Sequence, residues 1–169
     1  MVALNALYST MIRAYSEITP TVYDVARHIV ARSIDAALED GDEELVERIA
    51  TVTVGSKNQR NYSFATKYCN WHKQELFPIY DSYVDVCLWH LQKTGRIEKF
   101  CRQDIYYSYP EFKRVVRQFR DSLLPEEFTY KEIDQYLYVE GRRLVAAKAV
   151  LKQSTIAASS SKEDENGSE

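Results

Sequence analysis

Apolar residues recur at helical spacing along most of the chain, and this pattern predicts an all-α fold. The first run predicts a helix over Leu4–Glu17. The second begins at Thr19-Pro20, where an N-cap residue is followed by Pro at the first helical position, and it runs to Gly41. Asp42 is then expected to cap a third helix, because aspartate accepts hydrogen bonds from the free amides of a first turn.

The middle of the chain continues the helical pattern after one break. The run Ala50–Val54 has strand propensity but no obvious partner strand, so we interpret it as the frayed end of the third helix. Gly55–Asn61 is the clearest loop. A helix over Tyr62–Lys73 follows and is interrupted by Pro78. Asp81 or Ser82 is expected to cap a helix that runs to about residue 93.

The last third of the chain contains two more helices and a polar tail. Residues 96–109 are compatible with helix or strand, and Pro110 opens the helix EFKRVVRQFRDSLL. Thr129 and Glu132 form a capping-box pattern at the start of a helix that ends near Lys152. Residues 154–169 cannot bury a core and are expected to be a disordered acidic tail. We therefore expect a compact bundle of about seven helices in a single domain, residues 1–153.

Composition narrows the class of protein further. A chain of 169 residues can bury one core, and its 5 Gly and 4 Pro are too few for a turn-rich β-sandwich or barrel. The 3 cysteines show no metal-ligand spacing and are expected to be reduced, buried, small apolar residues. The start of the chain lacks a secretory signal pattern, and no apolar run approaches the ~20 residues that cross a bilayer. We therefore expect a cytoplasmic protein with no membrane contact.

Charge and tyrosine content are unevenly distributed. Residues 1–50 hold 4 basic and 9 acidic side chains, whereas residues 51–120 hold 12 basic and 6 acidic ones. A basic middle segment between acidic ends can serve an anionic partner. The 13 tyrosines suit either a wet groove or interface, or a helical core that uses Tyr in place of Leu and Phe. Both interpretations stay open at this point.

Common catalytic motifs are absent from the sequence. There is no phosphate loop, dinucleotide glycine pattern, nucleophile elbow or pair of metal-binding histidines, and His28, His72 and His90 are dispersed. We therefore expect no metal and no cofactor.

The most distinctive stretch is SFATKYCNWHKQELFPIYDS, from Ser63 to Ser82. It reads as a helix, a short linker with Pro78, and a second helix that begins at Asp81. Lys67 and Asp81 are 14 residues apart on the two adjacent helices, so their side chains can approach one cleft. The structural alternative is that Asp81 is only an N-cap, worth about 1 kcal/mol, and that Lys67 is a solvated charge.

This stretch resembles a family of uncharacterised bacterial proteins of similar size, in which a SFASK sequence, an aromatic residue and a His precede FPIYDS. The later segment FTYKEIDQYLYVEGRRLV, Phe128–Val145, is similar to the closing helix of that family, with Tyr138 in the place of a Trp.

PIYDSYV, Pro78–Val84, more distantly resembles an element of the helix-hairpin-helix DNA glycosylases, and Lys67 stands near the place of their hairpin lysine. The resemblance implies a glycosylase-like central helix pair. It makes Asp81 the carboxylate that stabilises a positively charged sugar and Lys67 a candidate amine nucleophile. The residues it implies for nucleic-acid contact are phosphate ligands at Lys57, Arg60 and Ser63, and base-contacting side chains at Tyr68, Trp71, His72 and Tyr80.

A second basic stretch, from Arg96 to Arg120, carries interleaved aromatic residues. It predicts either a face that binds the phosphate backbone of a nucleic acid and includes Arg114 and Arg117, or the solvated side of an amphipathic helix. The first functional hypothesis is therefore a nucleic-acid-binding helical protein, with DNA as partner and base recognition or base excision as its activity. The alternative is a non-enzymatic helical module, an accessory component of a bacterial or phage gene cluster, that binds a protein partner through its Tyr-rich surface.

Overall fold

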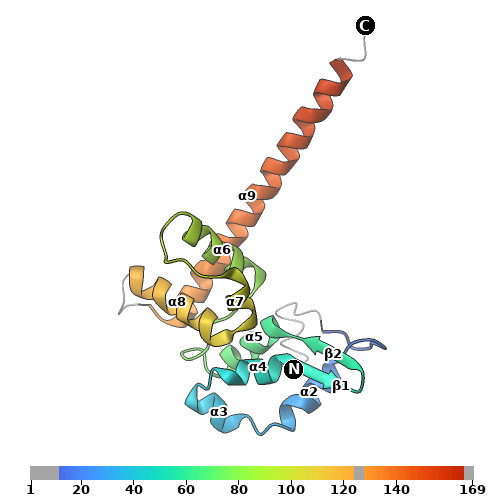
Figure 1. Ribbon diagram of the computed structural model, residues 1–169, viewed down its shortest axis with the longest axis vertical. Coiled ribbons are helices and arrows are strands. Elements are labelled where there is room, and N and C mark those ends of the chain that lie inside the picture. The colour runs from blue at the N-terminus through green and yellow to red at the C-terminus, as the bar shows by residue number, and fades with distance from the viewer. Residues whose placement is uncertain (1–11, 124–127, 166–169) are drawn as a thin grey trace.

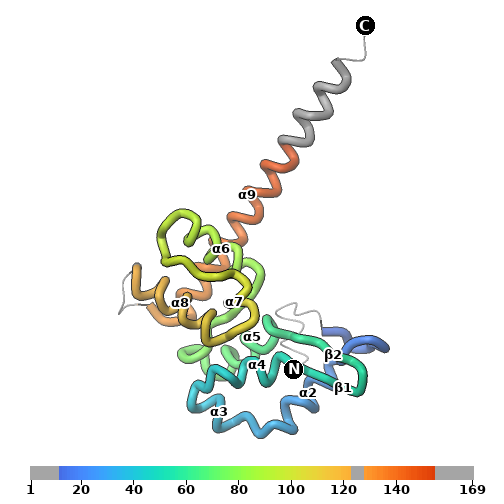
Figure 2. Tube along the Cα trace, viewed as in Figure 1, coloured from blue at the N-terminus to red at the C-terminus, as the bar shows by residue number. Residues whose placement is uncertain are grey.

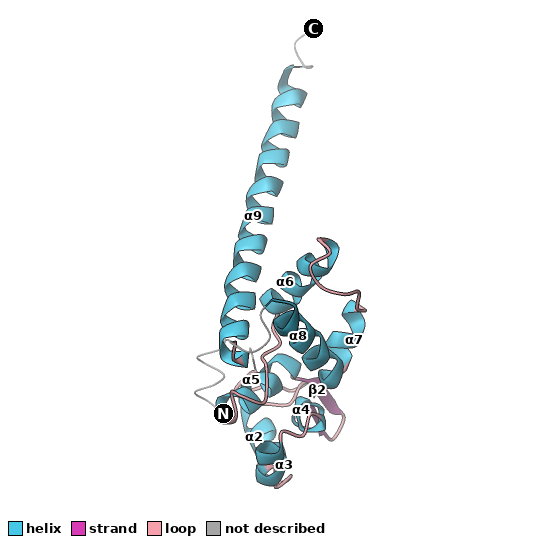
Figure 3. Cartoon of the chain, turned by 90° about the vertical axis from the view of Figure 1, so that its left-hand side faces the viewer, coloured by secondary structure: helices cyan, strands magenta, loops and turns pink. Residues whose placement is uncertain are grey.

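The structure, a computed structural model, describes residues 12–123 and 128–165. Helices dominate the described part, as the hydrophobic pattern predicted, and one small two-stranded sheet accompanies them (Figures 1 and 3). The elements are α2 (Val22–Val30), α3 (Asp35–Asp40), α4 (Glu44–Ala50), β1 (Thr51–Val54), β2 (Lys57–Arg60), α5 (Tyr62–His72), α6 (Ser82–Lys93), α7 (Arg102–Tyr107), α8 (Tyr109–Leu123) and α9 (Tyr130–Glu165).

The beginning of the chain differs from the prediction. Of the helix expected over Leu4–Glu17, residues 4–11 lie outside the described residues, and residues 12–17 are not helical. Helix α2 is capped by Thr21 rather than Thr19, because the Thr21 hydroxyl and the Asp24 carboxylate bond each other's backbone amides in a capping box. The predicted single helix up to Gly41 is split into α2 and α3 by a turn in which Ser33 adopts a φ of 48°.

The segment expected to be a frayed helix end and a loop is a β-hairpin. Strands β1 and β2 pair antiparallel, with Val54 opposite Lys57, so the turn consists of Gly55 and Ser56. Gly55 has a φ of 59°, which a glycine adopts without strain. Val52 is fully buried, so the strand propensity of this run is stabilised by packing against the helices.

The helices around the distinctive stretch match the prediction closely. Helix α5 covers Tyr62–His72, and α6 begins after Asp81 as its N-cap. The ambiguous residues 96–109 contain the short helix α7. Helix α8 includes the predicted EFKRVVRQFRDSL run, and the predicted capping box at Thr129 and Glu132 is present at the start of α9.

Helix α9 is longer than expected and only its first part is packed. Its main neighbour is α6, and Ile133, Leu137 and Gly141 face the body of the molecule. Tyr136 and Val145 are exposed. Beyond Gly141 the helix extends away from the other elements (Figure 1). It continues to Glu165, where the sequence predicted a disordered tail, and the domain boundary at residue 153 stays a prediction.

Figure 2 shows the two ends of the molecule. Helices α2, α3, α4 and the hairpin lie at the end opposite the projection of α9, and α6, α7 and α8 lie between. The core includes a cluster of tyrosine rings, Tyr62, Tyr80 and Tyr109, so this part of the tyrosine excess serves packing. Cys69 and Cys87 are buried as expected, but Cys101 is exposed.

Candidate functional site

A cleft of about 770 Å³ opens where α5, the N-terminus of α6 and the first turns of α9 meet. Two of its walls follow helical spacing. One stripe comes from α5, with residues at i, i+4 and i+7, and is continued by Gln74 in the turn after the helix. The second stripe comes from α9, with residues at i, i+3, i+4 and i+7. The lining residues are Ser63, Lys67, Asn70 and Gln74; Ile79, Asp81, Ser82, Tyr83 and Val84; and Lys131, Asp134, Gln135 and Tyr138.

Lys67 and Asp81, the two candidate catalytic residues, lie together in this cleft. The Lys67 Nζ is 4.0 Å from the Asp81 Oδ2, and Lys67 is only 7% exposed. Burial lowers the pKa of Lys67 below its usual value, because a charged ammonium is poorly solvated there, and attraction to Asp81 opposes this shift. The interpretation of Lys67 as a solvated surface charge is therefore wrong.

Asp81 serves both as helix cap and as partner of Lys67. Its Oδ1 accepts hydrogen bonds from the backbone N–H groups of Tyr83 at 2.9 Å and Val84 at 3.0 Å, while its Oδ2 faces Lys67. The helix N-terminus thus fixes the carboxylate and presents its second oxygen to the cleft. The capping and functional interpretations of Asp81 are both compatible with this geometry.

The linker Phe77–Tyr80 is held in place by side chains of α5. The Thr66 hydroxyl lies 3.1 Å from the backbone N–H of Tyr80 and 3.2 Å from its carbonyl oxygen, so it can pair with either group. Asn70 donates from its amide to the Phe77 carbonyl at 2.7 Å. These contacts fix the position of Asp81, which follows the linker directly.

Asp134 of α9 completes the attachment of the linker and was missed by the sequence analysis. Both of its carboxyl oxygens accept from the backbone N–H of Ile79, at 3.0 and 3.1 Å, and Oδ2 also accepts from the Asn70 amide at 3.3 Å. A signal existed, because Asp134 lies three residues before Leu137 and seven before Gly141, on the buried stripe of the helix.

The carboxyl group of Asp134 has unusual acid–base properties. Burial raises its pKa to about 8, the N–H of Ile79 works against the shift, and the nearby charge of Asp81 adds to it. At neutral pH this group therefore retains its proton, and the cleft holds one carboxylate, Asp81, and one neutral carboxylic acid.

The rim of the cleft is polar and aromatic. Gln74, Lys131 and Gln135 are exposed, and in the described part of the chain none of their side chains makes a hydrogen bond or ion pair with another residue. The rings of Tyr83 and Tyr138 meet edge to face with their centroids 5.3 Å apart. These groups can bind a planar polar ligand by hydrogen bonds and ring contacts.

The predicted base-contacting aromatic residues do not line this cleft. Tyr80 is buried in the core, where its ring packs against Tyr62 and Phe112, so it cannot stack on a ligand. Tyr68 is half-buried against Phe64 and His72, and Trp71 is 53% exposed. Base contact by Tyr68, Trp71 and His72 therefore stays a prediction, and the aromatic residues that line the cleft are Tyr83 and Tyr138.

The predicted phosphate ligands are also dispersed. Ser63 lines the cleft. Lys57 donates to the Ser16 carbonyl at 2.8 Å. Arg60 pairs with Glu47 at 2.7 Å, and its guanidinium lies 4.1 Å from the centre of the Tyr62 ring.

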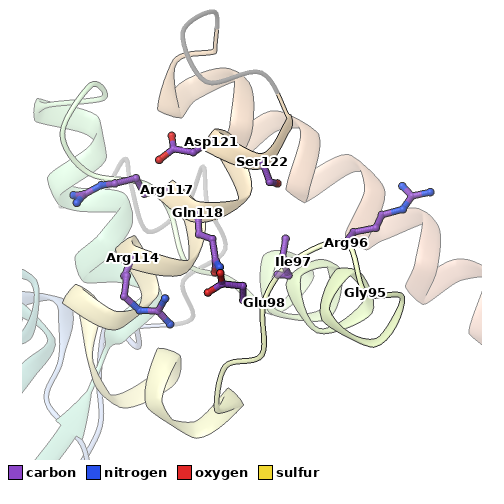
Figure 4. A pocket seen from close by; sticks show the side chains of 9 residues that line it. All are labelled: Gly95, Arg96, Ile97, Glu98, Arg114, Arg117, Gln118, Asp121 and Ser122. Carbon is purple, nitrogen blue, oxygen red and sulfur yellow. The ribbon is translucent and has the colours of Figure 1, made fainter.

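Arg114 and Arg117 lie at a separate groove between α8 and the segment after α6 (Figure 4). Arg114 is bonded to Glu111 at 2.6 Å, and Arg117 lies 3.8 Å from Glu43. In Figure 4 the side chains of Gln118 and Glu98 approach each other, whereas Arg117 points away from the groove. The predicted basic residues therefore do not form one face around Lys67 and Asp81.

The described residues contain no group of three or more His, Cys, Asp or Glu side chains that could hold a metal ion. Among the same residues, no helix is both long enough and apolar enough to span a bilayer.

Comparison with known proteins finds two similarities. Residues 1–76 match the family described as HI_0787_N, N-terminal domain. An uncharacterized protein of Haemophilus influenzae is 39% identical over 141 residues, which are 83% of this chain and 63% of that protein. The similarity to an uncharacterised bacterial protein confirms that part of the prediction. The relative is longer than expected, and the chain spans less than two thirds of its length. No solved structure matches.

Proposed function

We propose that this protein binds nucleic acid through the cleft and recognises a base there. The observation that carries the proposal is the pairing of Lys67 with Asp81 at 4.0 Å, inside a cleft whose rim presents two unengaged amides and two tyrosine rings. Glutamine side chains offer a donor and an acceptor side by side, which suits the edge of a base. Aromatic rings contact the faces of bases that are turned out of a helix.

Base excision is the enzymatic form of the same proposal, and it follows the resemblance to the helix-hairpin-helix glycosylases. The Asp81 carboxylate would stabilise the positive charge that develops on the sugar as the base leaves. Lys67, whose pKa is lowered by burial, would supply the amine. We place this activity on DNA in the bacterial cytoplasm as part of the proposal.

Fluorescence anisotropy with labelled single-stranded and duplex DNA at low salt tests the binding. We expect binding by the native chain and at least a tenfold loss in Lys67→Met, which keeps the apolar stem but removes the ammonium. Arg48→Gln is the matched control, because Arg48 is an exposed residue of α4, paired with Asp42 away from the cleft. Failure of every oligonucleotide to bind would refute the proposal.

Base release is measured separately on the bound DNA. Asp81→Asn keeps a good N-cap residue but removes the charge, so it should leave the fold and the binding in place and abolish release. Release at the native rate in this variant contradicts the catalytic role of Asp81.

A surface patch supports the second candidate, a protein-interaction module. Tyr107 is 66% exposed and lies beside Tyr106 and the guanidinium of Arg60. Tyrosine and arginine are enriched at the centres of protein interfaces. This candidate is favoured if the native chain binds no oligonucleotide, whereas Tyr107→Ala should leave the affinity for DNA unchanged if the cleft is the binding site.

A further inference from the structure

The cleft has the size and the chemistry of a site for one small ring system. Its volume of about 770 Å³ lies in the range of small-molecule pockets. The polar groups that remain available at the rim include the amides of Gln74 and Gln135 and the ammonium of Lys131. Amide groups recognise neutral donor–acceptor edges, whereas a strong phosphate site needs several cations or backbone amides.

The cleft also contains few charged groups. Lys67 faces the carboxylate of Asp81, whereas Lys131 lies on the same helix face as Asp134, which is neutral at pH 7. At most two cations, Lys67 and Lys131, are therefore placed to contact a phosphate from within the cleft.

Outside the cleft, the four basic residues that the sequence predicted to contact a nucleic-acid backbone each lie against an acidic or carbonyl group of the protein itself. Lys57 is bonded to a backbone carbonyl, Arg60 to Glu47 and Arg114 to Glu111, and Arg117 lies near Glu43. Binding a phosphate with any of these groups requires competition with its existing partner.

From this distribution we propose that the cleft takes a single unpaired nucleobase-sized heterocycle, and that the phosphate backbone contributes little to its binding. This inference rests on the proposed function and makes it more specific. The recognised chemistry is the edge and face of one heterocycle. Such a heterocycle is present in a free nucleoside and in an unpaired base of a single strand. A base within a stacked duplex does not expose its face.

Salt dependence distinguishes this site from a backbone-binding surface. The logarithm of the affinity for single strands falls with the logarithm of salt concentration at a slope of about −0.7 per phosphate contact. With one or two contacts, from Lys131 and Lys67, we expect a slope of roughly −0.7 to −1.4. If phosphates were also bound by Lys57, Arg60, Arg114 and Arg117, the slope would be about −4.

The experiment measures binding of free nucleosides, of a single-stranded 12-mer and of its duplex at several KCl concentrations, with calorimetry for the nucleosides and anisotropy for the strands. The inference predicts a shallow slope and at least tenfold weaker binding of the duplex. Nucleoside binding within tenfold of the strand supports a free nucleoside as ligand, and binding of the strand alone supports a base in a strand. A slope of −3 or steeper, or equal binding of duplex and single strand, overturns this inference and leaves the proposed function standing.

Two exposed residues provide matched variants. Gln135→Ala, in the cleft, should lower the affinity about fivefold, because it removes one amide from an exposed site without a partner in the described chain. Arg114→Gln, at the separate groove, should stay within twofold of the native chain. The opposite pattern contradicts the inference, and absence of binding to every nucleoside and oligonucleotide refutes the proposed function itself.

Discussion

Asp81 accepts two backbone hydrogen bonds with one oxygen and faces Lys67 with the other, so substitution can separate its two roles. Asp81→Ala should lower the free energy of unfolding by about 1 kcal/mol, the usual cost of a lost N-cap. Asp81→Asn should stay within a few tenths of the native value, because asparagine caps a helix equally well. Urea denaturation of the three proteins measures both differences. Equal losses in the two variants would show that the charge facing Lys67, and not the cap, carries the stability.

Asp134 should make the stability of the protein depend on pH. Its pKa is about 8 in the folded protein and 3.8 without the protein environment. Between these values the folded state holds a proton that the unfolded state has released, so the free energy of unfolding falls as pH rises. For this one group the slope approaches about 1.4 kcal/mol per pH unit at most, and the decline ends above about pH 8.

Comparison with Asp134→Asn isolates this contribution, because the amide does not titrate. The difference in free energy of unfolding between native protein and variant should change steadily from pH 5 to pH 8 and level off above, as measured by denaturation at each pH. Parallel profiles across this range contradict the raised pKa.

At the scale of elements, the β-hairpin shows how packing overrides a local prediction. The ATVTV run was expected to be a frayed helix end because the sequence shows no partner strand of similar hydrophobicity. Its partner, β2, is the polar segment Lys57–Arg60, whose backbone completes the hydrogen-bonded ladder. Strand propensity indicated the local structure correctly, and the hydrophobic pattern could not reveal a polar partner strand.

The two valines of the strand provide a matched test. Val52 is fully buried and Val54 is 40% exposed. Val52→Ala should lower the free energy of unfolding by about 2 kcal/mol, because it removes buried apolar surface and leaves a cavity. Val54→Ala should change it by about 0.5 kcal/mol or less. Chemical denaturation of both variants checks the difference, and similar losses would contradict the hairpin.

Gly141 explains why α6 and α9 pack so closely. A Cβ at this position would lie 2.0 Å from the backbone oxygen of Tyr83, so the two helices approach here without a side chain between them. Helix propensity alone predicts that Gly141→Ala stabilises the protein by up to about 1 kcal/mol. The contact predicts the opposite, a net loss of about 1–3 kcal/mol from overpacking.

Thermal denaturation decides between these outcomes for Gly141→Ala. Ala146 is an exposed residue of the same helix, so Ala146→Gly measures the effect of helix propensity alone. This variant should lower the free energy of unfolding by up to about 1 kcal/mol. A rise in melting temperature for Gly141→Ala would show that the helices do not touch at this point. Because Tyr83 lines the cleft, we also expect this variant to bind ligand more weakly.

At the scale of the whole molecule, the cleft joins segments that are far apart in the chain. Its α5 wall lies within residues 1–76, which match the N-terminal-domain family, whereas the α6 terminus and the α9 wall lie beyond them. Asp134 and Asn70 connect these parts across 64 positions of sequence. The site therefore depends on both parts of the chain being present.

Truncation tests which part of α9 the fold requires. A chain that ends at Gln153 should melt within about 2 °C of the full chain, because residues 151–154 are exposed. A chain that ends at Tyr138 loses Gly141 and its contact with Tyr83, and it should melt several degrees lower. Circular dichroism during heating measures both. A large loss for the first truncation contradicts the predicted domain boundary at residue 153.

The sequence alone determined the features that arise from local interactions. Hydrophobic spacing predicted α5, α6, α8 and the first part of α9, because the helical period depends only on nearby residues. Cap chemistry predicted Asp81 at the start of α6 and the capping box at Thr129. The 14-residue separation also placed Lys67 and Asp81 within reach of each other, and the structure has them 4.0 Å apart.

Only the tertiary structure decided which polar residues share the cleft. Burial raises the pKa of Asp134, and the tertiary packing places Tyr80 in the core. Neither result can be predicted from the residues next to Asp134 or Tyr80 in the sequence. The predicted basic residues shared a segment of sequence, but ion pairs with Glu47 and Glu111 and the course of the chain keep them away from the cleft. Contacts between segments that are distant in the sequence decide which polar residues line the cleft. The energies of these contacts depend on tertiary packing, which the pattern of hydrophobic and polar residues does not describe.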